Sequence, residues 1–222
     1  MDSIIRDRLI EHLGSFVSDN KLTKIEDVLR YRTRYVTLVL EDIFKAHNAN
    51  ATIRTSECMG VQDIHIIENS SPFSISDDVT QGSSKWVSLH RYRTGDQNNT
   101  VSCFQALRDQ GYYIIATTLD EHSLELDAVP LDKKMAFVFG NEDQGMSDYT
   151  LQNADATLKL PMHGFTQSYN ISVCVAMTLS AVIGRLHRSD IAWQLSEEEQ
   201  QELKLEWYKK IVRRSDLIEK VF

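Results

Sequence analysis

Short runs of β-branched and aromatic residues alternate along this chain with segments long enough to form helices, and this alternation constrains the fold more than any other feature. The runs lie at residues 35–40, 64–67, 86–89, 113–116, 135–139 and 156–160. Strands that alternate with helices pair mostly in parallel, and the helices then cover both faces of the sheet. We therefore expect an α/β fold with a mostly parallel sheet and helices on both faces.

Both ends of the chain carry helical patterns outside this alternation. Residues 3–31 have apolar residues at helical spacing, interrupted by Ser18, Asp19 and Asn20. Near the other end, Ser196 and Glu199 have the spacing of a capping box, which predicts the start of a final helix. The apolar stripe of that helix comprises Leu203, Trp207, Ile211 and Ile218. We expect an N-terminal helical extension (1–34), an α/β domain (35–188) and a C-terminal helical extension (189–222).

A further helical segment, residues 168–186, is apolar on nearly every side. A helix of this kind is buried, either inside a large core or against a partner subunit. The residues themselves leave both explanations open.

The net charge of −8 is unfavourable for binding nucleic acid, although affinity for phosphate depends on where the cations cluster. Two basic groups lie near the ends of the chain: Arg6, Arg8, Arg30, Arg32 and Arg34, then Lys210, Arg213 and Arg214. From charge alone, these groups are better explained as solvated faces of terminal helices. Charge therefore does not establish nucleic-acid binding.

The cysteines and the first residues indicate the compartment. Cys58, Cys103 and Cys174 are isolated and odd in number, which fits a reducing compartment and neither a disulfide framework nor a CxxC metal site. The first residues lack the apolar core of a signal peptide, and no segment is long enough to span a bilayer. We expect a soluble, cytoplasmic protein with no metal and no membrane contact.

The first of three polar segments follows the first strand-like run and contains Asn48 and Arg54. Asn48 is a candidate N-cap, which would place Arg54 about two turns into a helix, where its guanidinium could reach a phosphate. The alternative is a capped surface helix with an ion pair between Arg54 and Glu57.

The second segment, residues 139–147, follows the strand-like run at 135–139. Gly140 and Gly145 bracket a polar loop whose backbone can approach a flat ligand, and Ser147 is a candidate N-cap of the next helix. The loop matches neither GxGxxG nor a P-loop, so neither a dinucleotide fold nor an NTPase is supported. The alternative is an ordinary turn between a strand and a helix.

The third segment, residues 160–172, leads into the apolar helix. Pro161 ends the strand, Gly164 interrupts the loop, and Ser168 or Asn170 opens the helix. The alternative is that these polar residues only cap the helix.

Together, and in this order, the three segments resemble the three motifs of the SpoU/TrmH branch of the SPOUT methyltransferases. The matching residues are Asn48 with Arg54 and Thr55, the Phe-Gly-Asn-Glu sequence at 139–142 with Gly145 and Ser147, and Leu-Pro-Met at 160–162 with residues 167–172. The resemblance covers residues 35–188. The helical ends look like the extensions of the tRNA guanosine-2'-O-methyltransferase subgroup.

The resemblance implies a homodimer with a deep C-terminal trefoil knot, formed by roughly residues 137–175, that binds S-adenosylmethionine. Family members often carry Leu at the position of Tyr169. The residues that the resemblance assigns to cofactor binding are Thr118, Leu119, Phe139, Gly140, Asn141, Leu160, Met162, Ser168 and Tyr169.

The resemblance also assigns catalysis to Arg54, Asn48, Glu142, Ser168 and Asn170. Because a guanidinium is almost always protonated, we favour Arg54 as the group that grips the phosphate beside the target ribose, rather than as a general base. Asn48 would hold the Arg54 segment, Glu142 would shape the site, and Ser168 and Asn170 would complete it.

The resemblance implies RNA as the substrate, and the short helical extensions favour tRNA, with the D-loop guanosine at position 18 as the usual target. The two basic groups would contact phosphates and make binding sensitive to salt. Three alternatives stay open: a ribosomal RNA methyltransferase of the same family, a relative that binds RNA without catalysis, and an α/β enzyme of unrelated small-molecule chemistry.

Overall fold

The computed structural model describes residues 2–94, 98–220 and 222. They form two compact units, which are described separately. The α/β unit comprises Arg34–Trp193, and the helical unit comprises Met1–Thr33 together with Gln194–Phe222.

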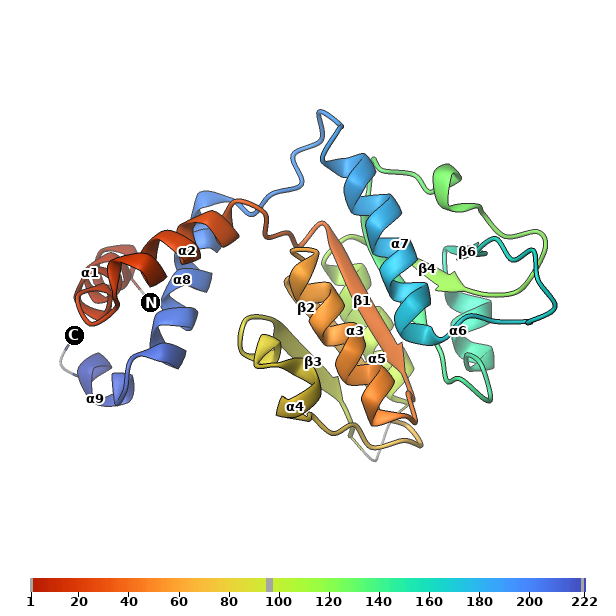
Figure 1. Cartoon of the computed structure of the whole chain (residues 1–222), viewed down its shortest axis with the longest axis horizontal. Helices are drawn as coiled ribbons and strands as arrows, with labels where there is room; N and C mark the ends of the chain where they lie inside the picture. Colours follow the sequence, from red (N-terminus) through yellow and green to blue (C-terminus); the bar gives the residue numbers. More distant parts are fainter. Residues whose placement is uncertain (1, 95–97, 221) are drawn as a thin grey trace. The chain divides into compact units, whose positions relative to one another are not determined.

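The α/β unit contains a parallel sheet, as the sequence predicts (Figure 1). Within the described residues, its strands run in the order β3-β2-β1-β5-β4-β6, and every neighbouring pair is parallel. The strands are β1 (Val36–Glu41), β2 (Asp63–Ile67), β3 (Ser88–Tyr92), β4 (Tyr112–Thr117), β5 (Lys134–Phe139) and β6 (Ala156–Leu158). The predicted start of the third run is wrong, because Trp86 ends a 3-10 turn, η1 (Ser83–Lys85), and β3 begins two residues later.

Helices cover both faces of the sheet, as predicted. On one face, α3 (Ala46–Cys58) packs beside α7 (Ile171–Leu186) (Figure 1). The other face carries α5 (Asn99–Asp109) and α6 (Asp148–Asn153). Short turns of helix, α4 (Asp77–Thr80) and η2 (Leu126–Ala128), lie in the connections.

The core follows from the alternation of side chains along a strand. In β1, Leu38 and Leu40 belong to the cluster under α3 and α7, whereas Val39 belongs to the cluster under α5. In β5, Phe137 belongs to the cluster under α3 and α7, and Val138 belongs to the cluster under α5. The central strands are therefore apolar on both sides, which explains why their sequences are continuous apolar runs.

Helix α7 buries one side in this core and leaves apolar surface on the other. Val175, Leu179 and Val182 are fully buried, whereas Val173 is 43% exposed in the single chain. The core accounts for only part of the apolar character of this helix.

The helical unit contains α1 (Ser3–Gly14), α2 (Asp19–Leu29), α8 (Glu197–Ile211) and α9 (Ser215–Glu219). Helix α1 packs on α8, and the unit buries Leu9, Leu13 and Trp207. The capping box of Ser196 and Glu199 at the start of α8 is confirmed.

Two details of the predicted terminal helices are wrong. The break between α1 and α2 precedes Asp19, because Asp19 and Asn20 form the first turn of α2, where an acidic residue suits the helix dipole. The final helix ends at Ile211, and Arg214, with a φ of 59°, separates it from α9, so Ile218 belongs to a different helix.

Within the described residues, no helix combines the length and the apolar character needed to cross a membrane.

Candidate functional site

The candidate site lies where the strands end. In a parallel sheet all carboxyl ends meet at one edge, and ligands bind where the chain leaves neighbouring strands in opposite directions. That point lies between β1 and β5, because β1 leads towards β2 and β3, while β5 lies beside β4 and β6. Leu40 pairs with Phe139, so the loops after both strands start side by side.

A chain of amide and carboxylate hydrogen bonds joins the three polar segments at this edge. Asn48 Nδ2, on α3, donates to Glu142 Oε1 at 2.6 Å, in the loop after β5. Asn170 Nδ2, at the start of α7, donates to Asn48 Oδ1 at 3.1 Å. The structure therefore brings together three of the predicted catalytic residues, which come from segments far apart in the sequence.

Asn170 opens α7 and belongs to this chain of hydrogen bonds at the same time. Its Oδ1 accepts from the Ser172 N–H at 2.9 Å, so it is the N-cap that the sequence predicts as one of two candidates. The cap fixes the Asn170 side chain, and the amide nitrogen is left to reach Asn48.

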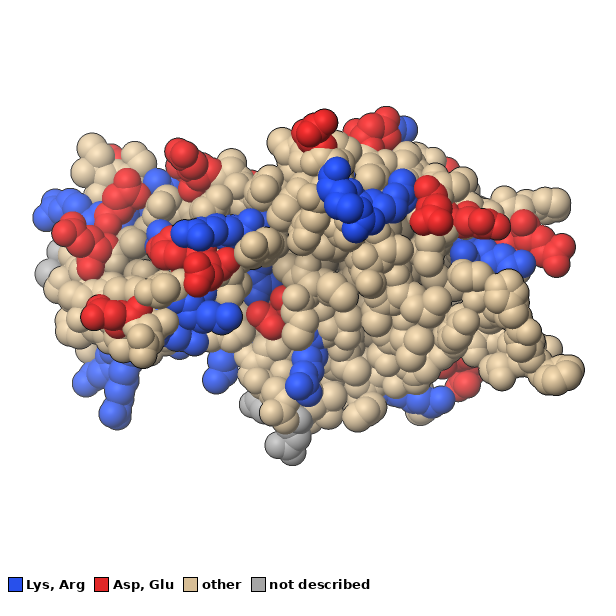
Figure 2. Space-filling view, turned by 45° about the horizontal axis from the view of Figure 1, so that its top comes forward, with Lys and Arg blue, Asp and Glu red and all other residues tan. Residues whose placement is uncertain are grey.

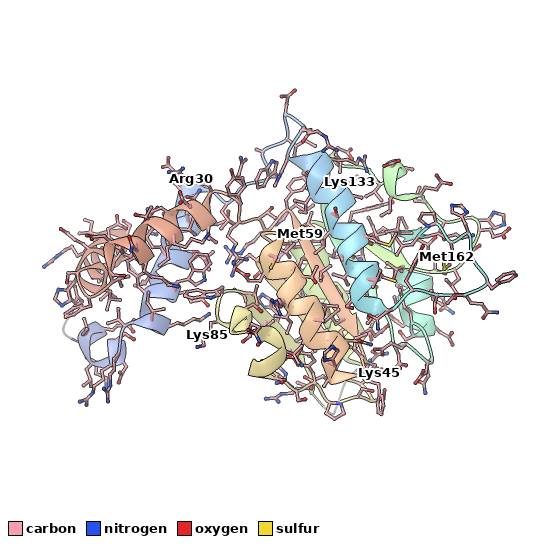
Figure 3. All side chains as sticks on the ribbon, viewed as in Figure 1. Arg30, Lys45, Met59, Lys85, Lys133 and Met162 are labelled. Carbon is pink, nitrogen blue, oxygen red and sulfur yellow. The ribbon has the colours of Figure 1, made fainter. Side chains whose placement is uncertain are left out.

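The prediction that Asn48 is an N-cap is wrong. Helix α3 begins at Ala46, with Lys45 in the capping position and without a side-chain cap (Figure 3 labels Lys45). Asn48 lies inside the first turn and is buried, so its amide bonds across to Glu142 instead of back to the helix backbone.

The loop after β5 is a tight turn. The backbones of Asn141 and Gly145 exchange two hydrogen bonds of 2.9 Å, and Gly145 has a φ of +74°. A Cβ on Gly140 would lie 2.6 Å from the Gly145 carbonyl oxygen, so only glycine fits there. Asn141 Oδ1 accepts from the backbone N–H groups of Asp143 and Gln144. Side chain and backbone together give this loop one shape.

Ser147 closes the same loop as the N-cap of α6, which confirms the prediction for this residue. Its Oγ accepts from the Thr150 N–H at 3.2 Å.

Among the described residues, a buried carboxylate oxygen in the site has no hydrogen-bond partner. Glu142 Oε1 bonds Asn48, whereas no described residue bonds the buried Oε2 atom. A buried carboxylate oxygen left in this way carries a desolvation cost, which a cationic or hydroxyl-bearing ligand would relieve.

Arg54 lies outside the chain of hydrogen bonds. It follows Asn48 by six residues on α3, which places it about 120° around the helix and about 9 Å along its axis. Its side chain is exposed, and it forms no hydrogen bond or ion pair with the residues that the structure describes. The alternative pairing of Arg54 with Glu57 is therefore not observed.

The third segment is open in the single chain. Residues 161–170 are mostly exposed, including Phe165 and Ser168, whereas Met162 is half-buried on the loop between β6 and α7 (Figure 3). Tyr169 is 39% exposed, and its hydroxyl donates to the Pro161 carbonyl at 2.9 Å. The prediction that Pro161 ends the strand is wrong, because β6 already ends at Leu158.

Of the residues predicted to bind the cofactor, five lie at or directly after the ends of β4 and β5, namely Thr118, Leu119, Phe139, Gly140 and Asn141, and the other four lie on the segment between β6 and α7. Strand β4 lies between β5 and β6, so the loops after these strands are neighbours. The Thr118 N–H donates to the Leu158 carbonyl at 2.8 Å, which joins the ends of β4 and β6. Leu119 follows and is 56% exposed.

Three of the basic residues predicted to contact RNA are engaged within their own units. Arg6 is buried and bonds Asp7 and Glu198. Arg32 has no exposed surface, and its guanidinium lies 5.3 Å from the centre of the Trp207 ring.

Arg34, in the α/β unit, donates to the buried Asp63 at 3.0 Å. Arg6, Arg32 and Arg34 are thus engaged by side chains of their own units, and their contact with RNA stays a prediction.

The other predicted basic contacts are exposed: Arg8, Arg30, Lys210, Arg213 and Arg214. Arg30 lies near Asp27 at 3.6 Å, and Lys210 bonds Glu206. On the face that Figure 2 shows, Lys and Arg side chains lie among Asp and Glu side chains.

Sequence reasoning missed Glu41, the last residue of β1. It is 2% exposed and accepts hydrogen bonds from Thr100, Ser147 and Thr150. An acidic residue after an apolar run is most often at the surface, so the sequence held no signal for this role.

The fold and the position of the site are those of an α/β enzyme that binds its ligands between the loops following parallel strands. Residues 35–180 match the model of the SpoU rRNA Methylase family, and the chain belongs to this family. The resemblance inferred from the three motifs is thus confirmed.

Individual relatives extend the match beyond the α/β unit. A tRNA (guanosine(18)-2'-O)-methyltransferase of Borreliella burgdorferi is 43% identical over 207 residues, which cover 93% of both chains. The tRNA (guanosine(18)-2'-O)-methyltransferase of Thermus thermophilus is 34% identical over 156 residues, 70% of this chain and 78% of that relative. A solved structure described as an A. aeolicus TrmH/SpoU tRNA modifying enzyme has a TM-score of 0.76 and 28% identity, covering 88% of this chain and 98% of that one.

Proposed function

We propose that this protein transfers a methyl group from S-adenosylmethionine to a ribose 2'-hydroxyl of RNA, and that its substrate is guanosine 18 of tRNA. The observation that carries the proposal is the hydrogen-bonded chain of Glu142, Asn48 and Asn170, which joins the three family motifs at the carboxyl edge of the sheet. The substrate follows from the relative in Borreliella burgdorferi, which matches along nearly the whole chain.

The reaction makes limited demands on the protein. S-adenosylmethionine supplies a methyl group already activated on a sulfonium, so a ribose C–O–CH3 linkage forms, the S–CH3 bond breaks, and the hydroxyl proton leaves. The protein must hold donor and ribose in line and accept or share that proton.

The residues at the site fit such a donor. The sulfonium and the amino group of S-adenosylmethionine are cationic, and Glu142 Oε2 is a buried acidic oxygen without a partner among the described residues. Backbone groups of the turn at Gly140 and of Leu119 would contact the flat adenine of the donor. We infer that the donor binds among the loops after β4, β5 and β6, and that residues 137–175 form the trefoil knot around it. The proposed contacts are Thr118, Leu119, Phe139, Gly140, Asn141, Leu160, Met162, Ser168 and Tyr169.

Arg54 would hold the RNA. Its exposed guanidinium is not engaged by any described side chain, so its donors are available to the phosphate beside the target ribose. Asn48 would keep the first turn of α3 in place, and Ser168 would complete the site.

We further propose that two chains associate through α7. In the single chain this helix leaves apolar side chains such as Val173 exposed, and the third segment beside it is open. A second copy would cover both. The proposed tRNA substrate also implies a cytoplasmic location, and the terminal extensions 1–34 and 189–222 would add phosphate contacts.

The test is to map 2'-O-methylation by mass spectrometry after incubating the purified protein with S-adenosylmethionine and an unmodified tRNA transcript. We expect one added methyl group at guanosine 18 and none in a transcript with adenosine at that position. A ribosomal RNA fragment mixture serves as the competing substrate, because the matched family is described as an rRNA methylase family. Methylation of rRNA alone would replace the proposed substrate, and no methyl transfer to any RNA would overturn the proposed activity.

A further inference from the structure

We propose that Glu41 is a positioning residue for methyl transfer: it holds the loop of residues 140–147 in the shape that binds the methyl donor. This inference rests on the proposed function. It goes beyond the three motifs, because Glu41 lies outside all of them.

Glu41 is a buried carboxylate that is fully engaged by hydrogen-bond donors. Oε1 accepts from Thr100 Oγ1 at 2.7 Å, from Ser147 Oγ at 2.8 Å and from Thr150 Oγ1 at 3.0 Å. Oε2 accepts from the Ser147 N–H at 3.1 Å, and it shares the single Thr150 hydroxyl proton with Oε1, since Thr150 Oγ1 lies 3.0 Å from both oxygens. All the donors are neutral, and no Lys or Arg among the described residues forms an ion pair with this carboxylate.

Two helix starts compensate the buried charge. Thr100 lies in the first turn of α5, and Ser147 caps α6, so Glu41 lies at the N-terminal ends of both helices. The partial positive charge at a helix N-terminus stabilises an anion there. The fold has therefore built an environment for a carboxylate at the end of β1, where an apolar residue would leave these donors unpaired.

The end of β1 holds both ends of the loop of residues 140–147. Asn141 Nδ2 donates to the carbonyl of Asp42 at 2.7 Å, and Ser147 bonds the neighbouring residue Glu41. Glu142 lies between these two attachments and reaches Asn48. The position of Glu142, and of the backbone from Gly140 onward, thus depends on Glu41 through Ser147.

Glu68 offers a matched control. It is another poorly exposed carboxylate that directly follows a strand, β2, and it accepts from the Phe73 N–H at 2.8 Å and pairs with Arg91 at 2.7 Å. Its loop is the one after β2, not the one after β5. Glu41→Gln and Glu68→Gln each keep the size of the side chain and replace one acceptor oxygen by a donor.

The experiment uses the full chain of both variants, with calorimetric binding of S-adenosylhomocysteine and backbone hydrogen exchange of the unliganded protein. For Glu41→Gln we expect binding about tenfold weaker, since one hydrogen bond to a charged group is replaced by a donor facing donors. We also expect faster exchange of the Gly145 and Ser147 amides. Glu68→Gln should bind S-adenosylhomocysteine as the wild type does, even where its thermal unfolding midpoint falls by as much as that of Glu41→Gln.

Three outcomes would overturn the inference: wild-type ligand affinity in Glu41→Gln, unchanged exchange in residues 140–147, or equal loss of affinity in both variants. Should Glu41→Gln prove too unstable to study, Ser147→Ala removes the hydroxyl link alone and should weaken binding in the same direction; wild-type affinity there would also overturn it. A wild-type protein that fails to bind S-adenosylhomocysteine would instead refute the proposed function, and the exchange measurement would still test Glu41.

Discussion

His65 is buried on β2, and His90 and Asp63 affect its protonation in opposite directions. Its ring stacks on His90 with 4.7 Å between centres, and its Nδ1 lies 3.0 Å from the Tyr92 hydroxyl. Burial, with a smaller contribution from His90, lowers the pKa of His65 to about 4, while the nearby Asp63 acts in the opposite direction. The folded protein therefore keeps His65 neutral at a pH where the unfolded chain has protonated it.

This pKa predicts loss of stability in mild acid. Between pH 6.5 and pH 4 the unfolded chain binds a proton at His65 that the folded chain does not, so unfolding becomes easier as the pH falls. From pH 7 to pH 5, the loss in free energy of unfolding from this residue is about 2 kcal/mol. Denaturant unfolding at several pH values measures this loss. In His65→Gln the free energy of unfolding should depend less on pH. The exposed His122 is the control: if His122→Gln reduces the pH dependence equally, or His65→Gln does not, the assignment to His65 is wrong.

Substitution of Arg54 should affect methyl transfer and binding of the methyl donor differently. Because its guanidinium lies outside the hydrogen bonds that join Asn48, Glu142 and Asn170, its loss should leave the site intact. For Arg54→Ala we expect methyl transfer to fall at least about a hundredfold, through lost alignment of the ribose. Affinity for S-adenosylhomocysteine should stay within about twofold of wild type. A variant that methylates tRNA normally would remove Arg54 from the mechanism.

At the scale of the elements, the loop between β5 and α6 has no room for a side chain at Gly140. Gly140→Ala places a Cβ 2.6 Å from the Gly145 carbonyl oxygen, and backbone atoms must then move. We expect a loss of about 1–3 kcal/mol in the free energy of unfolding and at least tenfold weaker binding of S-adenosylhomocysteine. Calorimetry and denaturant unfolding measure both.

The third segment supplies the control for this change. At Gly164, the position that a Cβ would take has no heavy atom within 4 Å, so Gly164→Ala adds the same methyl group without a clash. Its stability should match wild type within about 0.5 kcal/mol. Equal effects of the two alanines on stability and binding would show that the turn is not as tight as the geometry indicates.

The elements could be predicted from sequence to the extent that local pattern decides them. The runs at 35–40 and 135–139 became β1 and β5, because apolar β-branched residues fit a strand buried on both faces. Asn48 could not be placed in the same way. Its local preference is for an N-cap, but a hydrogen bond to Glu142, 94 residues away, requires it inside the helix.

At the scale of the whole molecule, distant partners also decide which basic residues are available to RNA. Arg6 bonds Glu198, 192 residues away, and Arg32 lies over Trp207. Local spacing contains no information on such partners. The sequence pattern therefore identifies two basic groups. It does not distinguish their exposed members, such as Arg213 and Arg214, from members that contact other side chains of the protein.

Arg213 is an exposed member of the second basic group and a proposed phosphate contact. Arg213→Glu should weaken tRNA binding about threefold to tenfold in 0.1 M salt and less at higher salt, because phosphate contacts release counterions. Filter binding over a salt series measures the effect, and cofactor affinity should not change. Lys133→Glu alters the net charge equally, at an exposed residue outside the proposed contacts. Equal weakening in both variants would mean that total charge, not the terminal helices, governs binding.

The hydrogen bonds from Glu142 through Asn48 to Asn170 also bear on how the protein is made. The strands β1 to β6 all precede residue 170, so a ribosome synthesises the sheet residues before the last of the three contributors to the proposed site. Under the proposed function, a chain can therefore transfer a methyl group only after residue 170 has been synthesised. A chain interrupted before α7 would lack Asn170 and, with it, the last contributor to the proposed site.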